Sequence, residues 1–138
     1  MFSKKYSSLA PLFIRLGLGI VFIVHGYMKL FGGIEETTGF FSSLSIPLPG
    51  FFAVVVAIVE FFGGLAILLG LFTQVVSILA FINMLFAFIL VHGKNGFNVS
   101  NGGFEFVFVL GLMALSLIFS GAGALSLDKL IFKKKYSH

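Results

Sequence analysis

Four long apolar segments fill most of this 138-residue chain, and they leave few alternatives to a helical membrane protein. The segments cover residues 12–31, 51–71, 74–91 and 104–119. Each is close to the ~20 residues that an α-helix needs to cross the hydrocarbon core of a bilayer. Because 59% of the residues are hydrophobic and only 10% are charged, a soluble domain of this size is excluded. We therefore predict an all-α fold, with residues 1–138 forming one membrane four-helix bundle.

Two short segments outside the predicted spans carry amphipathic patterns. Residues 34–44 begin with Glu35 and Glu36 and continue with aromatic side chains, which indicates an extracytoplasmic interfacial helix or a re-entrant turn. The prolines at 47 and 49 then mark the entry to the second span. Residues 125–132 alternate Leu and Ile with Asp128 and Lys129, which predicts a short C-terminal helix on the membrane surface.

Positive charge gathers at the two ends of the chain, and this pattern predicts the topology. Four crossings place both termini on one side, and the positive-inside rule makes that side cytoplasmic. We expect a multi-pass protein of the plasma (inner) membrane, and the net charge of +4 does not indicate nucleic-acid binding. Arg15 is interpreted as reaching the cytoplasmic interface or a lipid phosphate. The basic residues concerned are Lys4, Lys5, Arg15, Lys129, Lys133, Lys134 and Lys135.

The chain contains no cysteine, which limits the redox chemistry that it can perform alone. Thiol–disulfide exchange, thiolate metal ligation and iron–sulfur clusters on this chain are excluded. A redox function would need a bound cofactor, a substrate or a partner protein.

The candidate polar side chains of the spans lie near the centre or in the outer half of the predicted bilayer, whereas the inner half holds only Arg15, Ser77 and Ser116. At ~1.5 Å of rise per residue, Glu60 and Asn83 lie near its centre, and His25 lies ~6 Å further out. Glu105 follows at ~10 Å, and Lys29 and His92 at ~12–14 Å. Ionisable groups at such depths are costly, so each is a candidate for a functional site.

Glu60 is the central candidate, because a carboxyl group at mid-membrane is either protonated or paired with a cation. His25 and Lys29 on the first span are the nearest cations by depth. We predict that His25 and Glu60 are catalytic, as proton donor and acceptor, and that Lys29, Asn83, His92 and Glu105 bind the ligand. The competing interpretations are a structural clamp between two helices, a lysine that extends to the interface, a solvated loop histidine and a carboxylate that favours a helix N-terminus.

Metal and haem sites were weighed for the same residues. His25, Glu60, His92 and Glu105 offer suitable ligand chemistry for a metal ion, but no helical His/Glu spacing supports such a site, and we predict none. A haem held by His25 and His92 is disfavoured by a depth mismatch of ~8 Å.

Residue spacing also predicts which helix faces point inwards. In the first span, Arg15, Gly19, Phe22, Gly26 and Lys29 recur at steps of three and four. The second span presents Ala53, Ala57, Glu60, Gly64 and Ile67 on one face, so a neighbouring backbone can approach Glu60 closely. For the fourth span, we expect Glu105, Val109, Leu112 and Ser116 to face inwards.

An ordered set of motifs along nearly the whole chain resembles the DoxX family of small four-span membrane proteins. The motifs are Arg15-Leu16-x-Leu18-Gly19, His25-Gly26-x-x-Lys29, Ile46-Pro47-x-Pro49, Glu60-x-x-Gly63-Gly64, His92, Gly102-Gly103-x-Glu105 and Gly121-x-Gly123-x-x-Ser126-Leu127-Asp128. The resemblance implies a link to quinol oxidation or thiosulfate:quinone oxidoreduction, and some members are tied to membrane oxidoreductase complexes.

We therefore predict a quinone-interacting membrane subunit of an oxidoreductase system, with a His/Glu site in the outer half of the bilayer. Quinone is the expected cofactor, and no haem or iron–sulfur cluster is expected. The expected partners are the lipid bilayer and redox proteins, with oligomerisation left open. Two alternatives stay open: a proton or small-solute transporter, and a non-catalytic scaffold for redox partners.

Overall fold

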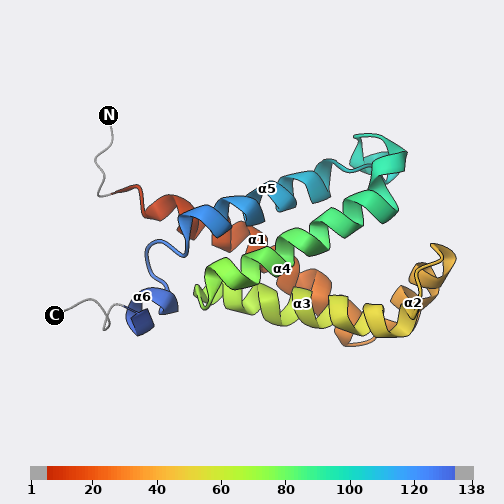
Figure 1. Ribbon diagram of the computed structural model, residues 1–138, viewed down its shortest axis with the longest axis horizontal. Coiled ribbons are helices and arrows are strands. Elements are labelled where there is room, and N and C mark those ends of the chain that lie inside the picture. The colour runs from red at the N-terminus through yellow and green to blue at the C-terminus, as the bar shows by residue number, and fades with distance from the viewer. Residues whose placement is uncertain (1–5, 133–138) are drawn as a thin grey trace.

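The computed structural model describes residues 6–132, and every regular element within that range is helical (Figure 1). The prediction of an all-α membrane bundle is therefore confirmed. Four long helices form the bundle: α1 (Leu9–Leu30), α3 (Pro49–Leu69), α4 (Thr73–Ala87) and α5 (Glu105–Ser120). The short helices α2 (Ile34–Ser43) and α6 (Leu127–Phe132) occupy the two segments with amphipathic patterns.

Three of the long helical segments are long and apolar enough to cross a membrane: Leu9–Leu30, Pro49–Leu69 and Thr73–Asn95. The third is α4 extended by a π-helical turn at Phe88–His92 and a 3-10 turn at Gly93–Asn95. Helix α5 is shorter, and its 16 residues span about 24 Å at the rise of an α-helix. The prediction of a fourth crossing therefore rests on a helix shorter than a typical bilayer core.

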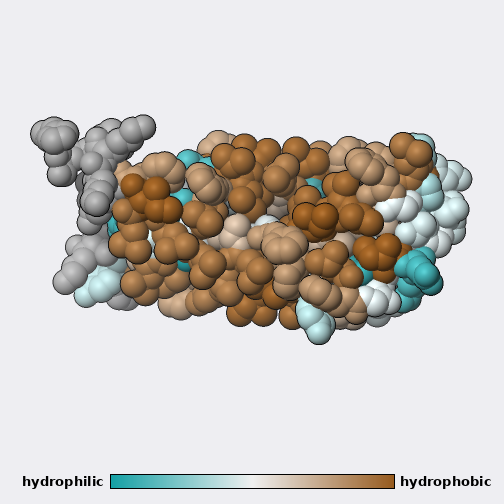
Figure 2. All heavy atoms as spheres, turned by 90° about the horizontal axis from the view of Figure 1, so that it is seen from below, coloured by the Kyte–Doolittle hydropathy of each residue, from teal (hydrophilic) through white to brown (hydrophobic). Residues whose placement is uncertain are grey.

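The four long helices pack as two pairs, α1 with α3 and α4 with α5. In Figure 1 the two pairs lie close together near α6 and diverge towards the other end of the bundle, which carries α2 and the loop 93–103. We call this the α2 end and the opposite one the α6 end. On the face shown in Figure 2, hydrophobic residues cover the middle of the molecule, while hydrophilic ones gather at the α2 end.

Glycines set the close approach of α1 to α3. A Cβ atom added at Gly26 would lie 2.2 Å from the backbone nitrogen of Phe61, and one at Gly64 would lie 2.7 Å from that of Ile23. Real side chains cannot occupy such positions, so the two backbones touch only because these residues are glycine. Contact through small residues is the usual way in which membrane helices associate.

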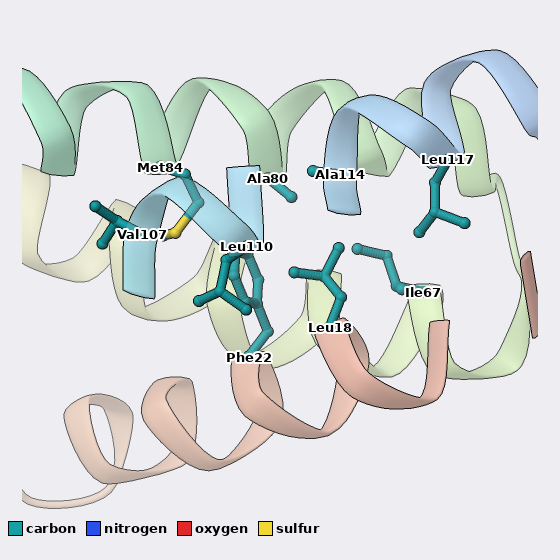
Figure 3. Close-up of a cluster of buried hydrophobic side chains, with 9 residues drawn as sticks. All are labelled: Leu18, Phe22, Ile67, Ala80, Met84, Val107, Leu110, Ala114 and Leu117. Carbon is teal, nitrogen blue, oxygen red and sulfur yellow. The ribbon is translucent and has the colours of Figure 1, made fainter. Parts of the chain in front are cut away.

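The buried apolar core joins both helix pairs (Figure 3). Leu18 and Phe22 of α1 meet Ile67 of α3 and an opposing group from the other pair. That group consists of Ala80, Met84, Val107, Leu110, Ala114 and Leu117.

The predicted inward faces of α1 and α3 agree with the structure, but that of α5 does not. The buried residues of α3 are Ala53, Ala57, Glu60, Gly64 and Ile67, the same five that spacing selected. On α5, Val109 and Leu112 are 53% and 50% exposed, and the helix instead buries Val107, Leu110, Gly111, Ala114 and Leu117. The prediction for α5 was wrong because its residues are apolar on every side, so spacing alone could not distinguish its faces.

Candidate functional site

A buried ion pair lies between α1 and α3 towards the α2 end of the bundle. Lys29 Nζ donates a hydrogen bond to Glu60 Oε2 at 2.5 Å. The side chain of Glu60 is 8% exposed and that of Lys29 is 25% exposed, so the pair is shielded on the α3 side and partly open on the α1 side. Such burial is tolerable because each charge has its counter-charge within contact distance.

Asn83 extends this pair to the second helix pair. Its Nδ2 donates to Glu60 Oε1 at 3.1 Å, so both oxygens of the carboxylate have a donor. Lys29, Glu60 and Asn83, which we call the polar trio, therefore link α1, α3 and α4. The three side chains are contributed by residues up to 54 positions apart, and only the packing of the two helix pairs brings them together.

His25 lies outside the polar trio. It is exposed on α1, one helical turn before Lys29, and its ring centroid is 6.0 Å from that of Phe106 on α5. His25 and Lys29 were the two cations nearest to Glu60 by predicted depth. In the structure Glu60 pairs with Lys29 and not with His25. His25 and Phe106 mark the line where α1 meets α5, whereas Asn83 and Glu60 mark the line where α4 meets α3.

His92 and Glu105 hold the loop 93–103 and are not joined to the polar trio. His92 Nδ1 lies 2.7 Å from the carbonyl oxygen of Gly102, and Glu105 Oε1 accepts a hydrogen bond from Val99 N at 2.6 Å. Asn95 Nδ2 also donates to the Gly102 carbonyl, at 3.1 Å. These contacts give His92 and Glu105 a local function in shaping the loop that closes the α4–α5 pair.

The residues weighed for a metal site are dispersed. Within residues 6–132, no group of three or more His, Asp and Glu side chains is arranged to hold a metal ion. His25 is exposed on α1 and Glu60 is buried on α3, whereas the side chains of His92 and Glu105 contact backbone atoms of the loop 93–103.

A second polar cluster, at the α6 end, was not recognised from the sequence. Arg15 is 1% exposed, and its guanidinium donates to the carbonyl oxygens of Ile67 and Leu68 at the end of α3. It also donates to those of Ala122, Ala124 and Leu125, which lead into α6. The interpretation of Arg15 as an interfacial or lipid-binding residue is wrong, because all of these acceptors are backbone atoms of the chain itself.

Asp128 completes the α6 end of the bundle. Its carboxylate accepts hydrogen bonds from the backbone nitrogens of Phe72 at 2.6 Å and Thr73 at 2.9 Å, where α4 begins. Gly70 is required at this junction, since its φ is +67° and an added Cβ would lie 2.5 Å from that of Ser126. The sequence signal for this cluster was the position of Arg15 on the inward stripe of α1.

Together, the apolar helical bundle and the buried charges at its two ends define a small integral membrane protein with a polar site between its helices. The chain belongs to the DoxX family, whose model matches residues 10–93 and so covers more than half of the sequence. Lys29, Glu60, Asn83 and His25 all lie within the matched region. No solved structure matches the chain significantly.

Curated relatives match the chain over most of its length. A Bacillus subtilis protein named "Putative oxidoreductase CatD" is 37% identical over 132 residues, which cover 96% of this chain and 94% of that protein. The inner membrane protein YqjF of Escherichia coli is 33% identical, and the match covers 95% of this chain and 98% of that protein. A second Escherichia coli inner membrane protein, YphA, is 28% identical, and the match covers 86% of this chain and 87% of that protein. These relatives and the long apolar helices establish a membrane protein in contact with the lipid bilayer.

Proposed function

We propose that this protein is a quinone-interacting membrane subunit of an oxidoreductase system. The observation that carries the proposal is the polar trio, in which a buried carboxylate is paired with a partly exposed lysine where two diverging helix pairs meet. Ionisable residues inside a membrane protein commonly mark the path of a substrate, an ion or a proton. The name of the relative CatD supports an oxidoreductase system, although it mentions no quinone.

In this proposal, the quinone head group enters between the helix pairs from the α2 end. Reduction of a quinone to a quinol consumes two electrons and two protons. A partner redox protein supplies the electrons, because the chain has no cysteine for thiol chemistry. His25 is exposed on α1, and an imidazole can both accept and donate a proton, so it can give a proton to one carbonyl oxygen. The second proton comes from the Lys29 ammonium and passes through the Glu60 carboxylate to the other carbonyl oxygen, and the partly exposed Lys29 is protonated again from solvent.

The remaining candidates support the site indirectly. Asn83 holds one oxygen of Glu60 and so fixes the orientation of the carboxylate. His92 and Glu105 shape the loop at the rim of the site through their bonds to Gly102 and Val99. The proposal needs no haem, iron–sulfur cluster or metal ion.

The membrane topology forms part of the same proposal. Four crossings, with α5 as the short fourth, place both termini and α6 in the cytoplasm and the polar trio in the outer half of the inner membrane. Figure 1 supports this arrangement, since α1 begins at the end that carries α6, while α2 and the loop 93–103 lie at the opposite end.

Quinone binding by the purified protein tests the proposal. The probe is a 1,4-benzoquinone with a decyl chain, measured by ultrafiltration with the protein in detergent. We expect His25→Ala and Glu60→Gln each to weaken binding at least tenfold, which corresponds to about 1.4 kcal/mol. Lys94→Gln, at an exposed lysine of the loop 93–103, is the control and should bind as the wild type does.

His25→Ala is the sharper variant, because His25 makes none of the hydrogen bonds of the polar trio and its loss leaves the ion pair in place. If the wild type does not bind the probe, or if both site variants bind it as tightly as Lys94→Gln, the proposal is wrong.

A further inference from the structure

An apolar groove of about 250 Å³ runs along the line where α3 meets α4. Its wall on α3 extends from Ile58 to Ala66, and its wall on α4 contains Val76 and Leu79. Ile58, Phe62 and Leu79 are 44%, 55% and 47% exposed, so the groove opens to the outside of the bundle. A groove with these walls favours a hydrocarbon chain over any polar ligand.

The groove ends beside the polar trio. Val59 lines the groove and directly precedes Glu60, and Asn83 lies one helical turn beyond Leu79. The hydrogen bond from Asn83 to Glu60 therefore crosses between α4 and α3 at the end of the groove nearer the α2 end. A ligand that occupied the groove and also reached Glu60 and Asn83 would be amphipathic, with a polar head and an apolar chain.

Gly63 leaves space in the groove and takes no part in the contact between α1 and α3. A Cβ atom added at Gly63 would have Val76 Cγ1 as its nearest neighbour, at an ordinary contact distance of 3.5 Å. The adjacent Gly64, by contrast, faces α1 and has no room for a side chain. The space at Gly63 is thus not required for packing within the chain.

We propose that this groove binds the isoprenoid chain of the quinone, whose head group lies at Glu60 and Asn83. This inference rests on the function proposed above and adds the place and chemistry of the tail. From Ile58 to Ala66 the groove follows α3 for about 12 Å, so it holds the part of the chain next to the head group. The rest of the chain lies among the lipids.

Chain-length dependence tests the inference. Binding is compared for two probes with the same 1,4-benzoquinone head group, one without a chain and one with a decyl chain. We expect the wild type to bind the decyl compound at least tenfold more tightly than the chainless one. Gly63→Leu, which places a side chain in the groove, should remove this preference and leave binding of the chainless probe unchanged.

Two further variants control the experiment. Val75→Phe adds bulk at a residue of α4 that is 62% exposed and does not line the groove, so it should keep the preference. Leu79→Trp fills the groove from α4 without a new Cβ atom and replaces Gly63→Leu if that variant does not fold. All variants are measured in the same detergent, so that partitioning of the decyl compound into micelles is constant.

The outcomes separate the two proposals. If the wild type binds neither probe, the proposed function and this inference both fail. If the wild type binds both probes equally, or if the groove-filling variants keep the preference for the decyl compound, only the inference is wrong. Displacement of the decyl compound by phospholipid at equal concentration would identify a lipid chain as the occupant and would also overturn the inference. A wild type that is a dimer, together with a Gly63→Leu variant that is a monomer, would identify a second copy of the chain as the occupant and would overturn it too.

Discussion

The ammonium of Lys29 and the carboxylate of Glu60 form an ion pair between two helices at a site where Glu60 is almost completely buried. The carboxylate also accepts from Asn83, so three helices share one charged centre. Loss of either charge leaves the other without its partner in an apolar environment, whereas loss of both leaves no unpaired charge. The pair therefore makes a specific prediction about coupled variants.

We predict that Lys29→Met and Glu60→Gln each destabilise the protein, by about 1–3 kcal/mol, because each leaves a shielded polar group without its partner. The double variant should lose less than the sum of the two single losses, by at least about 0.5 kcal/mol. Thermal unfolding in detergent, followed by circular dichroism, measures all three. Lys94→Met, at an exposed lysine, is the control. Additive losses would show that the two charges do not interact.

A second prediction concerns the contact between α1 and α3. Gly26→Ala would put a Cβ atom 2.2 Å from Phe61 N, and backbone atoms cannot move aside as a flexible side chain can. The helices must separate, and we expect a loss of about 3 kcal/mol, at the upper end of overpacking effects.

Gly39→Ala in α2 is the matched control, since an added Cβ there has no neighbour within 4 Å. Alanine forms helices better than glycine, so this variant should be neutral or more stable by up to about 1 kcal/mol. Thermal unfolding of the two variants in the same detergent provides the comparison. Equal stability of the two would contradict the close contact of α1 with α3.

The sequence predicted the faces of α1 and α3 well because small or polar residues interrupt their apolar sequence at helical spacing. Gly19, Gly26, Glu60 and Gly64 provide that contrast. Helix α5 offers almost none, and its inward face depends on which residues meet Met84 and Leu18 across the core. The all-helical fold could thus be predicted, whereas the orientation of an evenly apolar helix could not.

Depth along the helices could select candidate residues for a site, but it could not predict the contacts between them. Depth placed Lys29, Glu60 and Asn83 among the candidates, but the rotation of each helix decides which of them meet. Depth also grouped His92 and Glu105 with them, although these residues bind loop backbone atoms. Arg15 was misinterpreted because its acceptors lie 52 to 110 residues away along the chain, and backbone carbonyls carry no signal in a sequence.

A third prediction concerns Asp128, which caps α4 from a distant part of the chain. Its carboxylate binds two backbone N–H groups that have no acceptor within the first turn of that helix. We expect Asp128→Ala to cost about 1–2 kcal/mol, as the loss of a helix cap does. Asp128→Asn keeps one acceptor oxygen and should cost less. The test is thermal unfolding, and an Asp128→Asn variant less stable than Asp128→Ala would contradict the capping function.

The last prediction separates shape from charge at Arg15. Lysine keeps the positive charge, but its single ammonium cannot reproduce the planar fork that contacts five carbonyl oxygens on two segments. Arg15→Lys leaves several buried carbonyls unpaired, so we expect a loss of more than about 3 kcal/mol, nearly as large as that of Arg15→Met. Thermal unfolding measures the stability, and protease cleavage between α5 and α6 should become faster in both variants. If Arg15 served only as a cytoplasmic charge, Arg15→Lys would instead behave as the wild type in both measurements.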